Sequence, residues 1–304
     1  QLVCDPSVPD PTRPGPRPRS ETRERPELRA PIERQPELAD AADMHIELIE
    51  HIRRIQSRIP LPWFELNSAA VAKHNADGRP IVRFEDIPLE LTDLRLLVRQ
   101  IADVLRRHGA LDDADYAEIQ HIGRDMKLLS VASAWYRRAA ERGAALASAG
   151  LGSVSAEASG QGSPTGMLDQ VLGLAMRPFL SRCAEVLQRT DLAAWTHGFC
   201  PLCGGEPDFA VITPAAERHL ICSRCSLHWN FASLTCPHCN NSDRSRITSF
   251  ATPDGQYRVY ACDVCHRYLK AYDGRRATRP VLHIVDTVAT LPLDAAAMQR
   301  GYTS

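Results

Sequence analysis

Apolar side chains recur at helical spacing in the first part of the chain. Residues 44–59 carry leucine and isoleucine on one stripe, and residues 91–108 carry a longer stripe of leucine, valine and isoleucine. Intervals of three and four residues place such side chains on one face of a helix. Pro60 should end the first helix and Gly109 the second, because proline cannot continue a helix and glycine favours its C-terminal turn. The pattern therefore predicts two amphipathic helices.

The helical period continues, less regularly, up to residue 189. It predicts a long helix over 113–147 and another over 167–189, in which Pro178 should cause a kink or a division into two. The stretch over 152–166 is rich in glycine and serine, which is typical of a flexible loop. Several prolines and an Asp-Gly pair predict irregular structure over 61–88.

The pattern changes after residue 198. Helical spacing is lost, and short runs rich in β-branched and aromatic residues alternate with Pro, Gly, Asn and Ser. The expected strands cover 209–212, 219–221, 246–250 and 257–261. A later run over 281–289 also looks strand-like, and Asp294 is expected to cap a short helix that ends before Gly301. The predicted fold class is α+β, with helices first and a small β region second.

Residues 1–41 differ from the rest of the chain in composition. They contain nine prolines, seven arginines and eight acidic residues, with few apolar side chains. Such a segment cannot bury enough apolar surface to offset the entropy of ordering, so we predict a disordered tail in which Cys4 is a lone thiol. The remaining chain divides into a helical domain over 42–196, a β region over 197–279, and a C-terminal strand and helix segment over 280–304.

Cysteine spacing is the strongest chemical signal in the sequence. Eight of the ten cysteines form four Cys-x-x-Cys pairs in the β region. The pairs are Cys200/Cys203, Cys222/Cys225, Cys236/Cys239 and Cys262/Cys265. A thiolate is a soft metal ligand, and two thiolates on one tight turn can supply half of a tetrahedral site. The four turns therefore predict two Cys4 sites, each binding one metal ion.

Repeat spacing indicates which pairs share an ion. Eighteen residues separate the first two pairs and twenty-two separate the last two, whereas only ten separate the middle pairs. Each longer gap fits a β-hairpin that brings two turns together, and both halves begin with Cys-Pro-x-Cys, as in a duplicated unit. The expected sites are Cys200, Cys203, Cys222 and Cys225, and Cys236, Cys239, Cys262 and Cys265. A cross-braced arrangement, in which alternate pairs share an ion, stays open.

Other chemistry is less favoured for these cysteines. Cytoplasmic thiols are kept reduced, so disulfides are not expected. Cys236-Pro237-His238-Cys239 matches a thioredoxin-type redox motif, but that chemistry needs a βαβ context that the pattern lacks. The five histidines of the region should stay outside the sites, and Cys183 should be a buried apolar residue. Closed Cys4 sites leave no position for water or substrate, so we predict a protein that is not an enzyme.

Charge argues against a nucleic-acid partner. The formal net charge of the chain is -1, and ten Lys and Arg against seven Asp and Glu give +3 over residues 197–279. Eight thiolates around two divalent ions would more than cancel this charge, whereas phosphate contacts need clustered positive charge. The sequence also lacks a secretory signal and an apolar run of the roughly 18 residues that a membrane span needs. We therefore expect a cytoplasmic protein without membrane insertion.

An ordered set of motifs runs through the chain from about residue 167 onward. They are Arg177-Pro178-Phe179-Leu180, Phe199 to Pro207, Leu220 to Cys225 with Trp229, Cys262 to Lys270, Leu291 to Asp294, and Gly301-Tyr302. In these motifs the second half of the chain resembles the formate dehydrogenase accessory (FdhE) family. The chain departs from the family between Trp229 and the third cysteine pair, where the family commonly has a basic residue and this chain has Phe231-Ala232-Ser233-Leu234-Thr235.

This resemblance implies a cytoplasmic maturation factor that acts on the catalytic subunit of a molybdenum-containing formate dehydrogenase before its export or assembly. It also implies a helical domain joined to two rubredoxin-like modules, and it links iron to their sites, although Cys4 ligation accepts zinc equally well. We therefore expect an accessory protein whose helical domain binds the catalytic subunit and whose two metal ions stabilise the β region or sense redox state. A rubredoxin-like electron-transfer protein and a zinc-ribbon nucleic-acid-binding module are the alternatives, and a homo-oligomer stays open.

Overall fold

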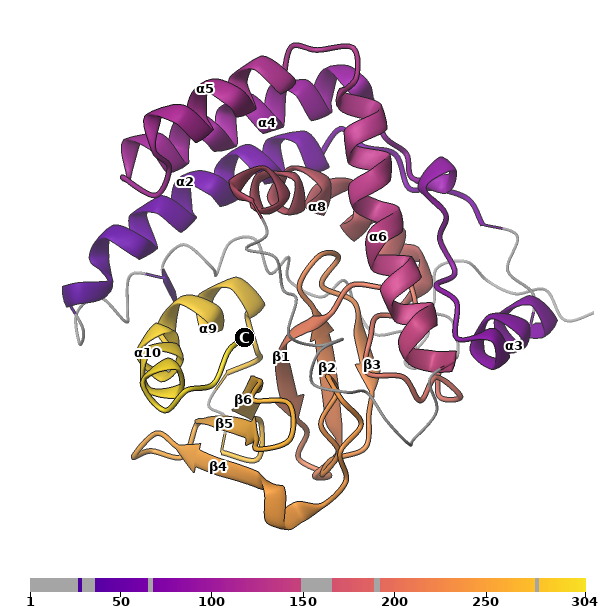
Figure 1. Cartoon of the computed structure of the whole chain (residues 1–304), viewed down its shortest axis with the longest axis vertical. Coiled ribbons are helices and arrows are strands. Elements are labelled where there is room, and N and C mark those ends of the chain that lie inside the picture. The colour runs from indigo at the N-terminus through magenta and orange to yellow at the C-terminus, as the bar shows by residue number, and fades with distance from the viewer. Residues whose placement is uncertain (1–26, 29–35, 65–67, 149–165, 189–191, 277–278) are drawn as a thin grey trace, which may run out of the picture.

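The computed structural model describes residues 27–28, 36–64, 68–148, 166–188, 192–276 and 279–304. Most of the predicted tail, with Cys4, and nearly all of the predicted loop over 152–166 lie outside these ranges. Helices occupy much of the described chain up to residue 188, and a β-sheet with two further helices follows (Figure 1). The α+β class predicted from the sequence is confirmed.

The helices of the first part pack their apolar faces together. Their bounds are η1 Pro36–Leu38, α2 Ala39–Gln56, α3 Ser68–Asp77, η2 Phe84–Asp86, α4 Leu91–Arg107, α5 Asp113–Ile122, α6 Leu128–Ser148 and α8 Met167–Leu187. The apolar stripe of α4 is buried from Leu94 to Leu105, and α4 packs against α2, α5 and α8. The strong amphipathic pattern over 91–108 therefore marks the centre of the helical layer.

Several helix boundaries differ from the sequence expectation. α2 begins at Ala39, among residues assigned to the tail, and α3 occupies part of the segment expected to be irregular. The helix expected over 113–147 is two helices, because the chain turns at Gly123, where a side chain would lie 3.0 Å from Cγ of Arg99. Pro178 lies inside α8 and does not divide it.

One six-stranded sheet includes Cys222 and Cys262, and the other paired cysteines lie in the loops before and between its strands. Its strands are β1 Pro207–Ile212, β2 Arg218–Cys222, β3 His228–Asn230, β4 Ile247–Ala251, β5 Tyr257–Cys262 and β6 Tyr268–Asp273. The strand order is β3-β2-β1-β6-β5-β4. The four expected strands are present with small shifts, whereas β3 and β6, which each follow a cysteine pair, were not expected.

Parallel pairing of β1 with β6 joins the two halves of the β region. The register places Phe209 opposite Lys270 and Ile212 opposite Asp273, while the other strand pairs are antiparallel. Every residue of β6 is buried, as expected for a central strand. The two cysteine-containing units therefore share one continuous sheet.

The segment after the sheet is helical. α9 spans His283–Ala289 and α10 spans Leu291–Gln299, so the strand expected over 281–289 is wrong. Asp286 explains the difference, because its fully buried carboxylate accepts hydrogen bonds from Leu282 N at 2.7 Å, Tyr257 Oη at 2.7 Å and Arg279 Nη2 at 2.6 Å. These bonds hold the first turn of α9 against β5, which overrides the β propensity of the run.

Two further carboxylates anchor the sheet. Asp294 was expected to cap α10, but the N-cap is Thr290, and Asp294 instead accepts hydrogen bonds from Tyr268 and Lys270 of β6. Asp273, fully buried at the end of β6, accepts hydrogen bonds from Arg258 at 3.1 Å and Arg275 at 2.7 Å. These contacts tie the C-terminal helices and the β5–β6 hairpin together.

The helical layer and the first half of the sheet share one core. In Figure 1, α2, α4, α5 and α8 lie over one end of the sheet, α6 runs beside β1 to β3, and α9 and α10 lie next to β5 and β6. One continuous cluster of buried side chains runs from α4 and α8 through α6 to the first four cysteines of the β region. Among the described residues, no helix has both the length and the hydropathy needed to cross a membrane.

Candidate metal centres

Four turns of the same construction carry the eight paired cysteines. In each turn the amide of the first cysteine donates to the carbonyl five residues later, and the amide four residues later donates back to that cysteine, at distances between 2.8 and 3.0 Å. The residue that follows the second cysteine has a positive φ in every turn: Gly204, Ser226, Asn240 and His266. This conformation curls the backbone so that both thiols point to the same side of the turn. We call these turns knuckles 1 to 4, in chain order.

The knuckles combine in sequential pairs. Cys200, Cys203, Cys222 and Cys225 form one group, the inner centre, and Cys236, Cys239, Cys262 and Cys265 form the other, the outer centre. Within each group all four sulfurs lie within 4.8 Å of one another. This is the grouping that the repeat spacing predicts, and it differs from the cross-braced alternative.

The sulfur separations fit a tetrahedral metal ion. Three sulfur pairs of the inner centre are 3.5, 3.5 and 3.8 Å apart, and two pairs of the outer centre are 3.7 Å apart. An ion with metal–sulfur bonds of about 2.3 Å would separate its four ligands by about 3.8 Å. A disulfide would need about 2.05 Å, so these thiols are not bonded to one another. Each group could therefore hold one zinc or iron ion, and the geometry alone does not select between them.

The thiols within each centre stabilise a thiolate. Hydrogen bonds from Cys200, Cys222 and Cys225 hold the pKa of Cys203 well below its usual range, whereas burial raises the pKa of Cys200 and of Cys225. In the outer centre, hydrogen bonds from Cys236 and Cys265 lower the pKa of Cys239 to about 2. A bound cation would extend this stabilisation to all four sulfurs, and iron would in addition supply one-electron chemistry.

The helical domain encloses the inner centre. Its four cysteines are 0 to 1% exposed. Backbone amides of Ile81 and Val82, in the segment before η2, donate to the carbonyls of Pro201 and Leu202 in knuckle 1 at 2.8 and 3.0 Å. Gly204 lies so close to α6 that a Cβ atom there would be 3.0 Å from Cα of Ala140.

Two arginines complete the enclosure at knuckle 2. The Arg224 guanidinium stacks 3.9 Å from the ring centroid of Trp135 on α6, and Arg177 of α8 donates to the Ser223 carbonyl at 2.7 Å. Both knuckles of the inner centre therefore bind the helical domain directly. The motif Arg177-Pro178-Phe179-Leu180, noted in the sequence, acquires a structural role here.

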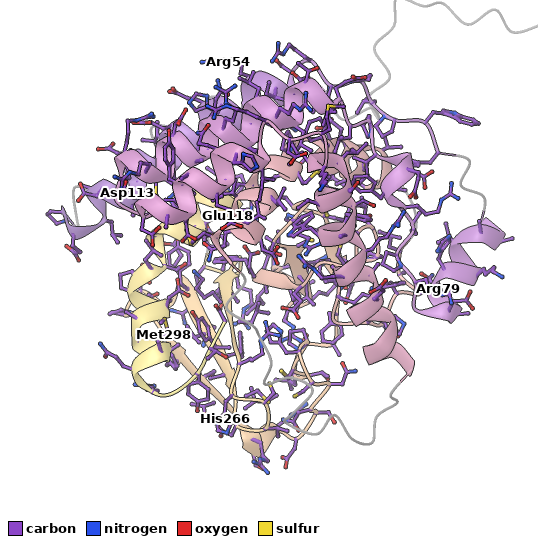
Figure 2. All side chains as sticks on the ribbon, turned by 45° about the horizontal axis from the view of Figure 1, so that its top comes forward. Arg54, Arg79, Asp113, Glu118, His266 and Met298 are labelled. Carbon is purple, nitrogen blue, oxygen red and sulfur yellow. The ribbon has the colours of Figure 1, made fainter. Side chains whose placement is uncertain are left out.

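The outer centre lies at the periphery. Cys236 and Cys262 are 6 and 2% exposed, but Cys239 and Cys265 are only partly buried, and Val264 between the knuckle 4 cysteines is 41% exposed. Figure 2 shows His266, which follows this knuckle, at the edge of the molecule far from the helical layer. The two centres thus have the same ligands but different access to solvent.

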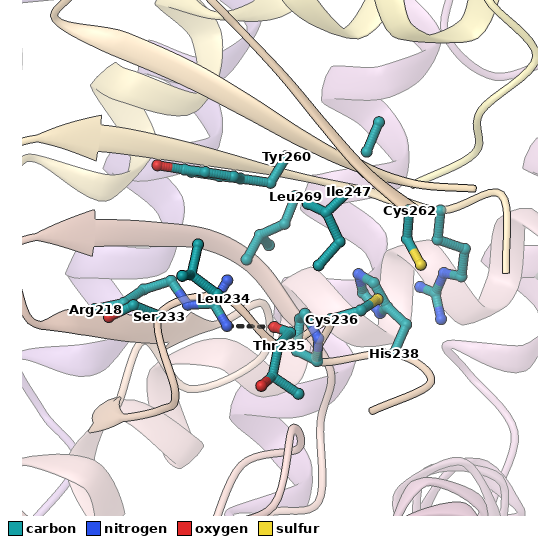
Figure 3. A pocket seen from close by; sticks show the side chains of 13 residues that line it. Arg218, Ser233, Leu234, Thr235, Cys236, His238, Ile247, Tyr260, Cys262 and Leu269 are labelled. Atoms are coloured by element: carbon teal, nitrogen blue, oxygen red, sulfur yellow. Dashed lines mark hydrogen bonds between the residues drawn. The ribbon is translucent and has the colours of Figure 1, made fainter. Parts of the chain in front are cut away.

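A small cavity of about 20 Å³ adjoins the outer centre (Figure 3). It is lined by Arg218, His238, Cys236 and Cys262 among others. The Arg218 guanidinium donates to the carbonyls of Ala232 and Thr235, so positive charge from β2 reaches the segment in which this chain lacks a basic residue. Burial lowers the pKa of Arg218 to about 10, which leaves it charged at neutral pH. No sequence pattern indicated a role for this arginine, because its partners lie in another segment.

The remaining sequence candidates lie outside the centres. Neither cysteine group includes a histidine among the described residues, and burial lowers the pKa of His238 to about 4, which keeps it neutral. Cys183 is fully buried on α8, as expected for an apolar role. Cys236 and Cys239 lie in a knuckle and not at the start of a helix after a strand, so the thioredoxin-type context is absent from this part of the described structure.

Comparison with known proteins gives a consistent result for the cysteine region. Residues 199–232 match the family model described as FdhE, central domain. The chain is 29% identical over 133 residues to the Protein FdhE homolog of Haemophilus ducreyi, which covers 42% of this chain and 43% of that protein. It is 29% identical over 107 residues to Protein FdhE of Escherichia coli, which covers 34% of each. The matches thus span less than half the length of these curated relatives.

A solved structure extends the similarity to the whole fold. The crystal structure of the FdhE protein from Pseudomonas aeruginosa superposes with a TM-score of 0.55, at 21% identity, over 92% of both chains. At this identity the superposition establishes the fold alone. The family-model match covers the two knuckles that form the inner centre. Together, the family model, the curated relatives and the shared fold show that this chain is similar to FdhE proteins in its cysteine region and in its fold.

Proposed function

We propose that this protein is a cytoplasmic maturation factor that binds the catalytic subunit of formate dehydrogenase and carries two thiolate-bound metal ions. The observation that carries the proposal is the coincidence of the FdhE match with the inner centre, since residues 199–232 include all four of its cysteines. The client, the catalytic subunit of formate dehydrogenase, is inferred from the motif resemblance. We assign client binding to the helical domain.

A non-enzymatic role agrees with the chemistry of the centres. Four thiolates complete the coordination of a tetrahedral ion, so that neither centre offers an open position at which water or substrate could be activated. Each ion would instead couple its binding energy to folding, as structural Cys4 sites do. The accessory protein would then act by binding, with its β region held in one shape.

The test is co-purification of the client with metal analysis of the same sample. The tagged full chain is isolated from cells growing on formate, and we expect the catalytic subunit of formate dehydrogenase and two metal equivalents per chain. The Cys183→Ala variant is the matched control, because it removes a buried cysteine outside both centres and should retain client and metal. The proposal fails if the wild-type chain, with both metals bound, does not retain the subunit.

Rubredoxin-like electron transfer is the second candidate, and the partial exposure of Cys239 and Cys265 favours it over a purely structural role for the outer centre. Electron exchange needs iron at a centre that a partner can approach. Protein purified without oxygen and then oxidised should become red through ferric-thiolate absorption. A colourless, zinc-loaded protein with full maturation activity would remove this candidate.

A further inference from the structure

We propose that the two centres have different exchange behaviour: the inner centre holds its ion permanently as part of the core, whereas the outer centre releases and rebinds a divalent ion through the face formed by Cys239 and Cys265. This inference rests on the proposed binding of one ion by each Cys4 group. It goes further because it assigns separate roles to two centres whose ligands are identical.

The two centres differ first in how deeply their cysteines are buried. All four inner sulfurs belong to residues at most 1% exposed, and the four cysteines form part of the main buried cluster of the protein. The outer cysteines belong to none of the buried clusters found among the described residues. A competing ligand can therefore approach Cys239 and Cys265 directly, whereas it can reach the inner sulfurs only after the protein opens.

The packing around each centre shows what must open. Releasing the inner ion requires knuckle 1 to leave Ile81, Val82 and the backbone of α6, and knuckle 2 to leave its arginine contacts with α6 and α8. Such an opening breaks the interface between the sheet and the helical domain. Openings of this size approach the free energy of global unfolding.

The outer knuckles are held by contacts outside the helical domain. In knuckle 4, Asp263 accepts a hydrogen bond from Tyr302 at 2.6 Å and exchanges hydrogen bonds with Arg246 at 2.9 and 3.1 Å, and the amide of Thr303 donates to the His266 carbonyl at 2.8 Å. Knuckle 3 packs against Gly198, where a Cβ atom would lie 2.0 Å from the Pro237 carbonyl oxygen. None of these contacts involves the helical domain, so the outer knuckles can move while the interface between the sheet and the helical domain stays intact.

Exchange at the outer centre needs no redox step. A divalent ion leaves its four thiolates for a chelator or another thiolate ligand, and the freed thiolates take up protons from water. Two arginines, Arg218 and Arg267, line the cavity beside Cys236 and Cys262, and Arg267 also pairs with Glu206 at 2.8 Å. The ligand class is a thiophilic divalent cation, zinc or ferrous iron.

The full chain loaded with two equivalents of Zn²⁺ and mixed with excess 4-(2-pyridylazo)resorcinol tests the proposal. We expect release in two phases of one equivalent each, with the faster phase at least about tenfold faster because only it avoids opening the domain interface. The Cys265→Ser variant should bind one equivalent and show only the slow phase. Tyr302→Phe should accelerate the fast phase by up to about fivefold, through loss of one hydrogen bond, and leave the slow phase unchanged. Cys183→Ala should retain both phases.

Alkylation of the wild-type chain shows which centre releases its ion first, without the use of a variant. Iodoacetamide added with a chelator should modify the four outer cysteines before the four inner ones, as read by mass spectrometry of the wild-type chain. A single release rate for both ions, earlier labelling of the inner cysteines, or uptake of fewer than two equivalents would overturn the proposal. Loss of client binding with two release phases would instead count against the proposed function alone.

Discussion

The contact between knuckle 1 and α6 can be tested by the substitution Gly204→Ala, which adds a single methyl group. Gly204 has a φ of +71°, and a Cβ atom there would lie 3.0 Å from Cα of Ala140, 3.0 Å from Cγ of Pro80 and 3.2 Å from the Ala139 carbonyl oxygen. Two of these neighbours are backbone atoms of a helix and the third belongs to a rigid ring. The Gly204→Ala substitution therefore requires the knuckle and α6 to move apart.

Gly109 provides the matched control for this substitution. Its φ is +68°, almost the same as that of Gly204, but nothing lies within 4 Å of a Cβ atom at that position. Gly109→Ala should cost only the penalty of the left-handed conformation, about 1 to 2 kcal/mol. Gly204→Ala should cost that amount plus about 1 to 3 kcal/mol for overpacking against the helix.

The assay compares the free energy of unfolding of the two variants with that of wild type. Urea unfolding is followed by circular dichroism in samples that each contain two metal equivalents, so that metal loss does not enter the comparison. We expect Gly204→Ala to be less stable than Gly109→Ala by at least about 1 kcal/mol. Equal destabilisation would show that knuckle 1 is not seated on α6, and the enclosure of the inner centre would then be wrong.

Three further predictions concern buried charge and the ligands. Asp286→Ala should destabilise the protein by about 3 to 5 kcal/mol in urea unfolding, because it removes a fully buried carboxylate that accepts hydrogen bonds from the partly buried Arg279, the Tyr257 hydroxyl and the Leu282 amide; a loss below about 1 kcal/mol would contradict this. Hydrogen bonds from Arg275 and then Arg258 hold the pKa of Asp273 well below its usual range, so its contribution should be present at neutral pH and decline as the pH falls below about 4. The stability difference between wild type and Asp273→Asn, measured from neutral pH downward, should therefore shrink, and a constant difference would refute the assignment. Cys200→Ser and Cys262→Ser should each lose one of the two metal equivalents by elemental analysis while the helical domain stays folded, and retention of two would disprove the grouping.

The sequence predicted those elements whose structure is determined by residues within the element itself. The apolar stripe of α4 and the hairpins between cysteine pairs could be predicted because helical periodicity and turn chemistry act within a few residues. The helix α9 could not be predicted, since its run of β-branched residues favours a strand. The helical turn at Asp286 depends on the buried hydrogen bonds of its carboxylate, one of them from Tyr257 of another element, 29 residues away. The parallel pairing of β1 with β6 also depends on contacts about 60 residues apart, which no local pattern encodes.

The candidate metal centres also have some features that could be predicted from the sequence and others that could not. The two cysteine groups could be predicted from spacing, because each knuckle is a local turn formed by a Cys-x-x-Cys pair. The surroundings of the inner centre could not be predicted, because Trp135, Arg177 and the segment at Ile81 lie far from its cysteines in the sequence. The role of Arg218 could not be predicted either, since it donates to the carbonyl of Thr235, in the segment that connects the two hairpins.

One local feature nevertheless distinguishes the two centres. All four knuckles need a positive φ at the residue after the second cysteine, and three of them use Ser226, Asn240 or His266, which have side chains. Only knuckle 1 has glycine there, and it is the knuckle whose backbone lies against α6. A left-handed residue with a side chain is tolerated where that side chain has room, as at His266 on the edge of the molecule. Glycine at this position thus reflects enclosure as well as turn geometry, and within this chain it marks the centre that the helical domain has made part of its core.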